Sequence, residues 1–275
     1  NHFYDPVYDR GLTSNFGDGQ KSKDWASDEA SQNGLRYNPV IATILASLQQ
    51  NKVEKFFPTS NFTWTEAIRY YLNDNREMAM FTLGHILHLL EDASVPDHTR
   101  NDPHPHIGND ELGTGSPYEI WTSQFNLSNL DLSKKLLSKK PINLDNLNAY
   151  FDELAKYSNS NFYSKDTIGV GEYKSPEPDY FATGKDGRRY GFKNDNEFGD
   201  YPILAANSII EFATNGVQLL GFSEITSSYW DRLSVKSVQY GAGLIDLFFK
   251  EVEKAKNDLN FAREQKKSFV AQAIE

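Results

Sequence analysis

Residues 77–92, EMAMFTLGHILHLLED, carry the strongest helical pattern in the chain. At about 100° per residue, their leucines recur on one side of a helix, whereas His85, His88 and Asp92 share a second stripe at positions i, i+3 and i+7. Most of the girth is apolar, so the pattern predicts a helix in the middle of a bundle with one polar seam. Burying that seam costs several kcal/mol unless its imidazoles and carboxylate gain partners, which a metal ion or a hydrogen-bond network would provide.

The rest of the chain shows the same periodicity. Apolar residues at helical spacing predict further helices over residues 39–50, 63–72, 201–220 and 229–256, with Thr63 as a candidate N-cap of the second. Strand-like alternation is scarce, so the predicted fold class is all-α, a multi-helix bundle. Residues 168–200 are rich in glycine and proline, and they predict a long irregular surface excursion with room for a short hairpin.

Length and composition bound the organisation and exclude some functions. We expect one helical domain over residues 1–256 and a polar helical tail or connector over residues 257–275, which would lead into a further domain. A net charge of −10 argues against a basic groove, so no stable nucleic-acid partner is expected. Cysteine is absent, which leaves nitrogen and oxygen as the ligands for any metal. No apolar run approaches the roughly 20 residues that span a bilayer.

The histidines are concentrated. The chain has 6, of which one is His2 and the others fall between residues 85 and 106. Pro96 breaks the helix, so we expect His98 on a loop just past the helix end, where it can turn back toward Asp92. Imidazole and carboxylate together suit zinc and similar divalent metals, and a hydrogen-bonded core cluster is the alternative. His85 lies a turn further away and is expected to be no ligand.

Two other stretches allow different interpretations. Ser116-Pro117-Tyr118-Glu119 predicts a helix start, in which Glu119 completes a capping box and needs no metal. His104 and His106 lie in a proline-rich loop, where surface histidines are expected.

These residues resemble a known family. The block Leu83-Gly84-x-x-x-His88-x-x-x-Asp92-x-x-x-Pro96-x-His98 resembles the core motif of the zinc-dependent phospholipase C and P1 nuclease superfamily. His2-Phe3-Tyr4-Asp5-Pro6 and Ser116-Pro117-Tyr118-Glu119 resemble the blocks on either side of it in the bacterial phospholipases C, and residues 232–249 resemble the closing helix. The resemblance covers most of the helical domain 1–256, without the 168–200 excursion.

The resemblance implies an all-α bundle that holds up to three zinc ions in a cleft and hydrolyses phosphoester bonds with metal-activated water. Carried over residue by residue, His2 and His88 would hold a first zinc ion. Asp92 would bridge that ion and a second one, and would take part in water activation through the metal. His98 and Glu119 would hold the remaining ion.

The chain also departs from the family pattern. A histidine stands four residues before the glutamate ligand in the family, and here that position is Gly115. Asp102 and His104 are the candidates to replace it. The family's earlier ligands lie upstream of the His2 block and have no counterpart from Asn1 onward. We therefore expect one to two zinc ions per chain and an incomplete third site.

The expected function is that of a zinc-dependent phosphoesterase acting on phosphodiester bonds, with phospholipid as the first substrate class. Aromatic residues of the 168–200 excursion would then touch a membrane surface, with local packing as the alternative. A single-strand nuclease is one alternative. Others are a metal-stabilised binding or structural module that has lost part of its metal site, and a bundle with no metal and a hydrogen-bonded histidine cluster. The resemblance also implies a bacterial protein that is secreted or at the cell surface.

Overall fold

The computed structural model describes residues 2–13, 19–33, 61–104, 115–123, 131–168, 171–173, 176–206 and 223–258. The helices are α1 (Ser22–Ser27), α2 (Glu29–Gln32), α6 (Trp64–Leu72), α7 (Arg76–Asp92), α8 (Pro96–Thr99), α9 (Pro117–Ser123), α10 (Asp131–Leu136), α11 (Leu147–Asn161), the 3-10 turn η1 (Lys165–Thr167) and α13 (Ser223–Asn257). The strands are β1 (Tyr180–Thr183), β2 (Arg189–Lys193) and β3 (Tyr201–Ala206). The helix predicted over residues 39–50 and most of the tail lie outside the described residues.

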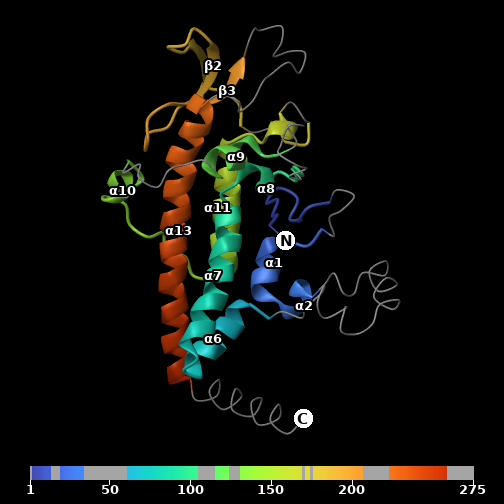
Figure 1. Cartoon of the computed structure of the whole chain (residues 1–275), viewed down its shortest axis with the longest axis vertical. Helices are drawn as coiled ribbons and strands as arrows, with labels where there is room; N and C mark the ends of the chain where they lie inside the picture. The colour runs from blue at the N-terminus through green and yellow to red at the C-terminus, as the bar shows by residue number, and fades with distance from the viewer. Residues whose placement is uncertain are drawn as a thin grey trace.

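The helical part is a bundle in which α6, α7 and α11 pack against α13, which runs along their whole length (Figure 1). Its core contains the fully buried side chains of Ile86, Leu90, Leu154, Leu244 and Phe248. The predicted helix over residues 63–72 is confirmed by α6. Thr63 caps it, since its side chain accepts a hydrogen bond from the Glu66 N–H at 3.3 Å. The helix predicted from residue 229 begins earlier, at Ser223.

The central helix α7 is less buried than the sequence predicts. Ile86 and Leu90 face the core, but His85 and His88 are exposed and Phe81 retains 53% exposure. The expectation of a helix enclosed on all sides is therefore wrong. Its neighbours cover the apolar side, and the histidine stripe faces outward, so the imidazoles are accessible from solvent.

The fold is mostly helical and is not purely all-α, because a three-stranded antiparallel sheet in the order β1-β2-β3 caps one end of the bundle. β1 and β2 form a hairpin whose turn contains Gly187 at a φ of +79°. The predicted 168–200 excursion thus holds regular structure as well as loops.

The helix predicted over residues 201–220 is wrong at its start, where residues 201–206 form β3. Ile203 and Leu204 are both fully buried, so neighbouring side chains on opposite faces of the strand are apolar. An apolar run of this kind suits a helix or a buried strand equally, and antiparallel pairing with β2 decides for the strand.

The sheet builds a second apolar core with the first turns of α13. Ile203 and Leu204 pack there with Phe162, Tyr229 and Leu233. α13 therefore contributes to both cores. None of the described helices is both long enough and apolar enough to cross a membrane.

One glycine of α13 is needed for close packing. A Cβ at Gly243 would lie 1.8 Å from the carbonyl oxygen of Ile142, so the chain before α11 crosses α13 where no side chain stands. The Ile142 N–H donates to the Gln239 carbonyl at 3.0 Å, which holds the crossing in place.

Candidate metal centre

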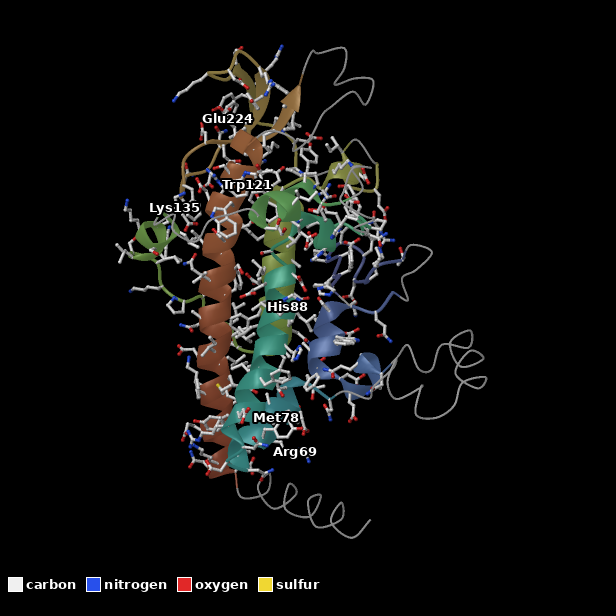
Figure 2. All side chains as sticks on the ribbon, in the orientation of Figure 1. Arg69, Met78, His88, Trp121, Lys135 and Glu224 are labelled. Carbon is white, nitrogen blue, oxygen red and sulfur yellow. The ribbon has the colours of Figure 1, made fainter. Side chains whose placement is uncertain are left out.

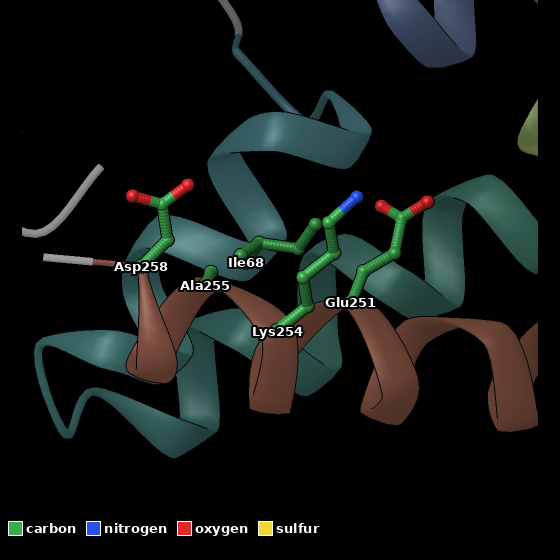
Figure 3. Close-up of a pocket in the computed structure, with 5 residues that line it drawn as sticks. All are labelled: Ile68, Glu251, Lys254, Ala255 and Asp258. Atoms are coloured by element: carbon green, nitrogen blue, oxygen red, sulfur yellow. The ribbon is translucent and has the colours of Figure 1, made fainter. Parts of the chain in front are cut away.

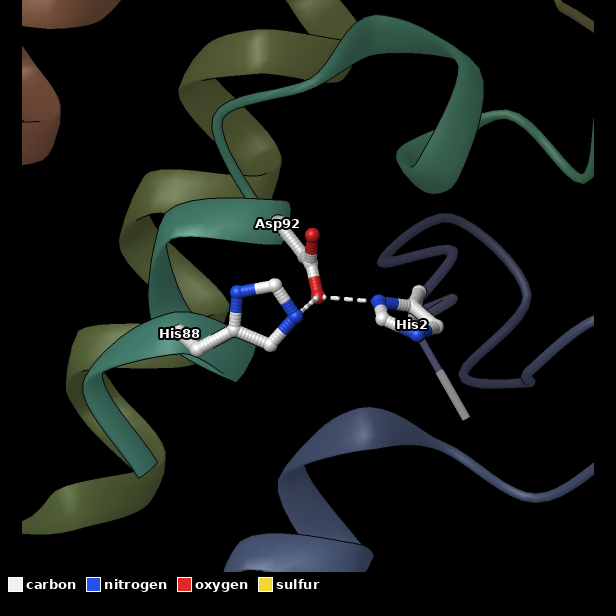
Figure 4. Close-up of side chains that lie close together, drawn as sticks. All are labelled: His2, His88 and Asp92. Carbon is white, nitrogen blue, oxygen red and sulfur yellow. Dashed lines mark hydrogen bonds and ion pairs between the residues drawn. The ribbon is translucent and has the colours of Figure 1, made fainter. Parts of the chain in front are cut away.

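A first cluster of possible metal ligands joins the N-terminal segment to the end of α7. His2 Nδ1 lies 2.6 Å from Asp92 Oδ2, and His88 Nε2 lies 3.6 Å from the same oxygen (Figure 4). The Asp92 side chain is 10% exposed, whereas those of His2 and His88 are 51% and 57% exposed. This first cluster, His2, His88 and Asp92, therefore opens to solvent. In Figure 2, His88 lies part-way along the bundle, between Met78 and Trp121.

A second cluster comprises His98, His104 and Glu119. His104 Nε2 lies 2.8 Å from Glu119 Oε2, and His98 Nε2 lies 3.5 Å from Glu119 Oε1. The two imidazoles are stacked with centroids 5.0 Å apart, and their Nε2 atoms are 3.2 Å apart. The side chains of His98 and His104 are only 5% and 10% exposed, so this second cluster is more enclosed than the first.

Asp92 faces both clusters. Its Oδ2 contacts His2, and its Oδ1 lies 3.4 Å from His98 Nδ1. In each cluster the candidate ligand atoms all lie within 4.8 Å of one another. All five residues predicted as ligands thus take part in one continuous arrangement. Whether Asp92 bridges two ions directly stays a prediction.

His98 is positioned differently from the sequence prediction. It lies in the one-turn helix α8, not on a loop. Pro96 occupies the first turn of this helix, where its missing N–H is tolerated, and Val95 before it is extended. Pro96 therefore ends α7 and begins α8. The Tyr4 N–H donates to the His98 carbonyl at 3.0 Å, which fixes the N-terminal segment beside α8.

The structure shows only one half of the capping box that was predicted at Glu119. The Ser116 hydroxyl accepts a hydrogen bond from the Glu119 N–H at 3.2 Å, which is the predicted N-cap. The Glu119 carboxylate points instead to His104 and His98. Capping uses the backbone of this residue and leaves its side chain available to a metal.

The remaining histidines and Asp102 differ in whether they join a cluster. His104 is only partly exposed, with 10% of its side chain accessible, and belongs to the second cluster, so the expectation of a surface histidine is wrong. The Asp102 carboxylate lies in neither cluster of the described residues; it accepts a hydrogen bond from the Asp166 N–H at 3.0 Å. His85 stacks on Phe62 at 4.7 Å and lies outside both clusters, as expected. His106 lies outside the described residues.

Contacts with histidine shift the pKa of Asp92 in the first cluster. Burial raises the pKa of Asp92, but the hydrogen bond from His2 and the nearby His98 outweigh burial and lower it to about 2. Asp92 is therefore a carboxylate over the whole ordinary pH range, which is the form that binds a metal ion.

The pKa values of His104 and Glu119 in the second cluster are also shifted by their contacts. Burial lowers the pKa of His104, but the hydrogen bond with Glu119 and the charge of Asp97 raise it to about 9. Burial raises the pKa of Glu119, and the hydrogen bond from His104 overcomes this and lowers it. Asp97 itself is 1% exposed, and burial followed by repulsion from Asp102 raises its pKa to about 6.

The donor set fits a divalent metal such as zinc. Imidazole nitrogens and carboxylate oxygens are its ligands in proteins that lack thiolates. Among the described residues, Asp97 Oδ1 is buried without a hydrogen-bond partner, and the buried His98 Nδ1 has only the 3.4 Å contact with Asp92 Oδ1. A buried carboxylate oxygen beside a histidine cluster gains stability from a positive charge nearby. The residues present therefore fit a bound cation.

A pocket of about 290 Å³ adjoins the first cluster. His2 and His88 form one wall, and its other lining residues are Trp25, Gln32, Phe62, His85 and Leu89. Gln32 ties the walls together, since its side chain donates to the Trp25 carbonyl and accepts from the Phe62 N–H. No sequence pattern predicts this pocket, because Trp25 and Phe62 lie far apart along the chain.

A second pocket, of about 350 Å³, lies between α6 and the end of α13 (Figure 3). It is lined by Ile68, Glu251, Lys254, Ala255 and Asp258. It contains no histidine, and Glu251 accepts a hydrogen bond from the Trp64 indole. The pocket beside His2 and His88 is therefore the candidate substrate site.

No protein-family model matches the chain, and no curated protein or solved structure matches it either. The family resemblance of the histidine block thus stays a prediction from the sequence.

Proposed function

We propose that this protein is a zinc-dependent hydrolase of phosphodiester bonds, with its active site at the two clusters. One observation carries the proposal: the Asp92 carboxylate stands between two clusters of nitrogen and oxygen ligands, and the first of these opens to solvent. Paired metal sites of this kind clamp the attacking and leaving oxygens in phosphoryl transfer. An open coordination position is also the mark of a catalytic rather than a structural zinc site.

The ligands fall into two sets, one for each proposed ion. His2, His88 and Asp92 would hold one ion, and His98 and Glu119 would hold another. When bound, zinc acts as a Lewis acid and lowers the pKa of a water ligand toward neutrality. Asp92 orients His2 through their hydrogen bond and faces His98 with its other oxygen, so it sets the relation between the two clusters.

The adjoining pocket would receive a substituent of the phosphodiester. Its aromatic and aliphatic lining favours an apolar or flat group over an anion. Phospholipid is the first substrate class to test and single-stranded nucleic acid the alternative. Of the aromatic residues expected to touch a membrane, Tyr173 and Tyr190 are buried, whereas Tyr180 and Phe181 are exposed at 40% and 37%. Tyr180 and Phe181 would make that contact.

Metal content and hydrolysis test the proposal together. We expect two zinc ions per chain by plasma mass spectrometry, and turnover of a choline phospholipid, single-stranded DNA or a simple phosphodiester. Asp92→Asn removes the charge shared by the clusters and is expected to lower kcat/KM by at least about a hundredfold. Asp246→Asn, the same change at an exposed position of α13, serves as the control.

Two results would contradict the proposal. A zinc-loaded protein that hydrolyses none of these substrates, yet melts at higher temperature with zinc, would favour the metal-stabilised binding or structural module. A protein that binds no metal would favour the hydrogen-bonded histidine cluster.

A further inference from the structure

The hydrogen positions on His104 follow from its neighbours. His104 Nδ1 lies 2.9 Å from the backbone carbonyl oxygen of Asp102. A carbonyl oxygen only accepts hydrogen bonds, so Nδ1 must carry the hydrogen. In the neutral ring, Nε2 then presents a lone pair. This is the arrangement in which metal-ligating histidines are commonly fixed.

His98 is fixed in the same sense. Its Nδ1 faces Asp92 Oδ1 at 3.4 Å, and a carboxylate oxygen is an acceptor. The hydrogen of the neutral ring therefore belongs on Nδ1, and His98 Nε2 also presents a lone pair. The two Nε2 atoms, 3.2 Å apart, share their space with the Glu119 carboxylate. With both rings neutral, three acceptors thus converge. In the metal-free protein a proton on His104 Nε2 can be donated to the Glu119 carboxylate, and a metal ion would take the place of that proton.

The spacing of these atoms suits a zinc ion. For bonds of about 2.0–2.1 Å in a tetrahedron, neighbouring ligand atoms stand about 3.3 Å apart. The imidazole nitrogens are 3.2 Å apart, His98 Nε2 lies 3.5 Å from Glu119 Oε1, and His104 Nε2 lies 2.8 Å from Glu119 Oε2, so each ring faces its own oxygen of the carboxylate. A proton on one imidazole would satisfy one pair of acceptors, whereas a metal ion satisfies all three.

The packing keeps His104 in this place. The Phe3 ring contacts both imidazoles, with centroids 4.9 Å from His98 and 5.6 Å from His104. Gly115, where the family pattern has a histidine, has no side chain to offer. His104 comes from the segment just after α8 and reaches the same carboxylate from another direction.

We infer that His104 is the third protein ligand of the second zinc ion, together with His98 and Glu119. The inference rests on the proposed function for the nature of the ion. It assigns the ligand to a position eleven residues before the one that the family pattern uses.

Metal binding tests the inference without any substrate. Metal-free protein would be titrated with Zn²⁺ by calorimetry and with Co²⁺ by visible absorption. We expect two ions for the wild type. For His104→Ala we expect one ion at unchanged affinity and the other bound at least about a hundredfold more weakly, since even outer-shell partners of a metal contribute 10–100-fold. His85→Ala, a histidine of α7 outside both clusters, is expected to keep both ions.

Chemical rescue distinguishes a ligand from a packing residue. Added imidazole is expected to restore the second ion in His104→Gly, because the free ring can enter the space and offer the same lone pair. Circular dichroism before titration checks that the variants fold. If His104→Gly does not fold, His104→Gln tests the loss of the second ion by titration, without the rescue. Retention of both ions at wild-type affinity by a folded His104 variant would overturn the inference and leave the hydrolase proposal standing. A wild type that binds no metal would overturn both.

Discussion

Replacing Asp97 by asparagine should stabilise the metal-free protein in a way that depends on pH. Asp97 Oδ2 accepts a hydrogen bond from the Ser116 hydroxyl at 2.9 Å, and among the described residues its Oδ1 has no partner. Burial, with repulsion from Asp102, raises its pKa from 3.8 to about 6. The folded state therefore holds this proton more tightly than the unfolded state does. Stability must fall as pH rises from about 4 to about 6, and the loss persists at higher pH.

The size of the effect follows from the two pKa values. The interval from 3.8 to about 6, at about 1.4 kcal/mol for each pH unit, corresponds to a loss of about 3 kcal/mol at pH 7. Asparagine keeps an acceptor for Ser116 and carries no charge, so the loss should disappear in Asp97→Asn. Part of this loss is already present at pH 4, so the difference in free energy of unfolding between variant and wild type should grow by about 2 kcal/mol between pH 4 and pH 7.

Urea unfolding with a chelator present, at several pH values between 4 and 7, measures this difference. The pH 4 value serves as the reference, because the carboxyl group is then largely protonated in the folded state. With zinc bound, the nearby positive charge should reduce the growth, since it favours the ionised form of Asp97. A difference that stays constant from pH 4 to pH 7 in metal-free protein would refute the reasoning.

Two further changes test the packing and the pocket. Gly243→Ala places a Cβ 1.8 Å from the Ile142 carbonyl oxygen and should destabilise the fold by about 1–3 kcal/mol, whereas Gly84→Ala, which meets nothing within 4 Å in α7, should stabilise it by up to about 1 kcal/mol. Equal effects of the two in urea unfolding would contradict this. Phe62→Ala removes a wall of the pocket and should raise KM about tenfold for a phosphodiester with a bulky apolar substituent, while kcat and zinc content stay unchanged. An unchanged KM would place the substituent elsewhere.

The helices that could be predicted from the sequence are those that local patterns determine. α6 and α7 follow from periodic apolar residues and from caps such as Thr63, whose effect reaches only a few positions. β3 depends on a partner strand about ten residues away, and an apolar run carries no sign of that pairing. The apolar periodicity of residues 201–206 suits a helix and a strand equally, and the tertiary contact with β2 therefore decides for the strand.

The candidate site was predictable where one element carries several ligands. His88 and Asp92 share a helix face, and His98 follows after a proline, so their proximity is a matter of short-range geometry. His104 was not predictable in the same way. Its burial depends on Phe3 and Glu119, which approach it from distant parts of the chain. A proline-rich loop reads as exposed unless such partners are known.

The hydrogen bond from the Tyr4 N–H to the His98 carbonyl has a consequence for how the site opens. The segment that carries His2 is anchored on the helix that carries His98, so detaching these few residues would remove one ligand and loosen another, at the cost to the apolar cores of Tyr4 alone. Such a subglobal opening costs less than global unfolding. A ligand that binds only the closed form makes the opening rarer in proportion to its concentration. Amide exchange at Tyr4 would therefore act as a gauge of metal occupancy, slowing as the ions bind even when the bundle's own exchange rates do not change.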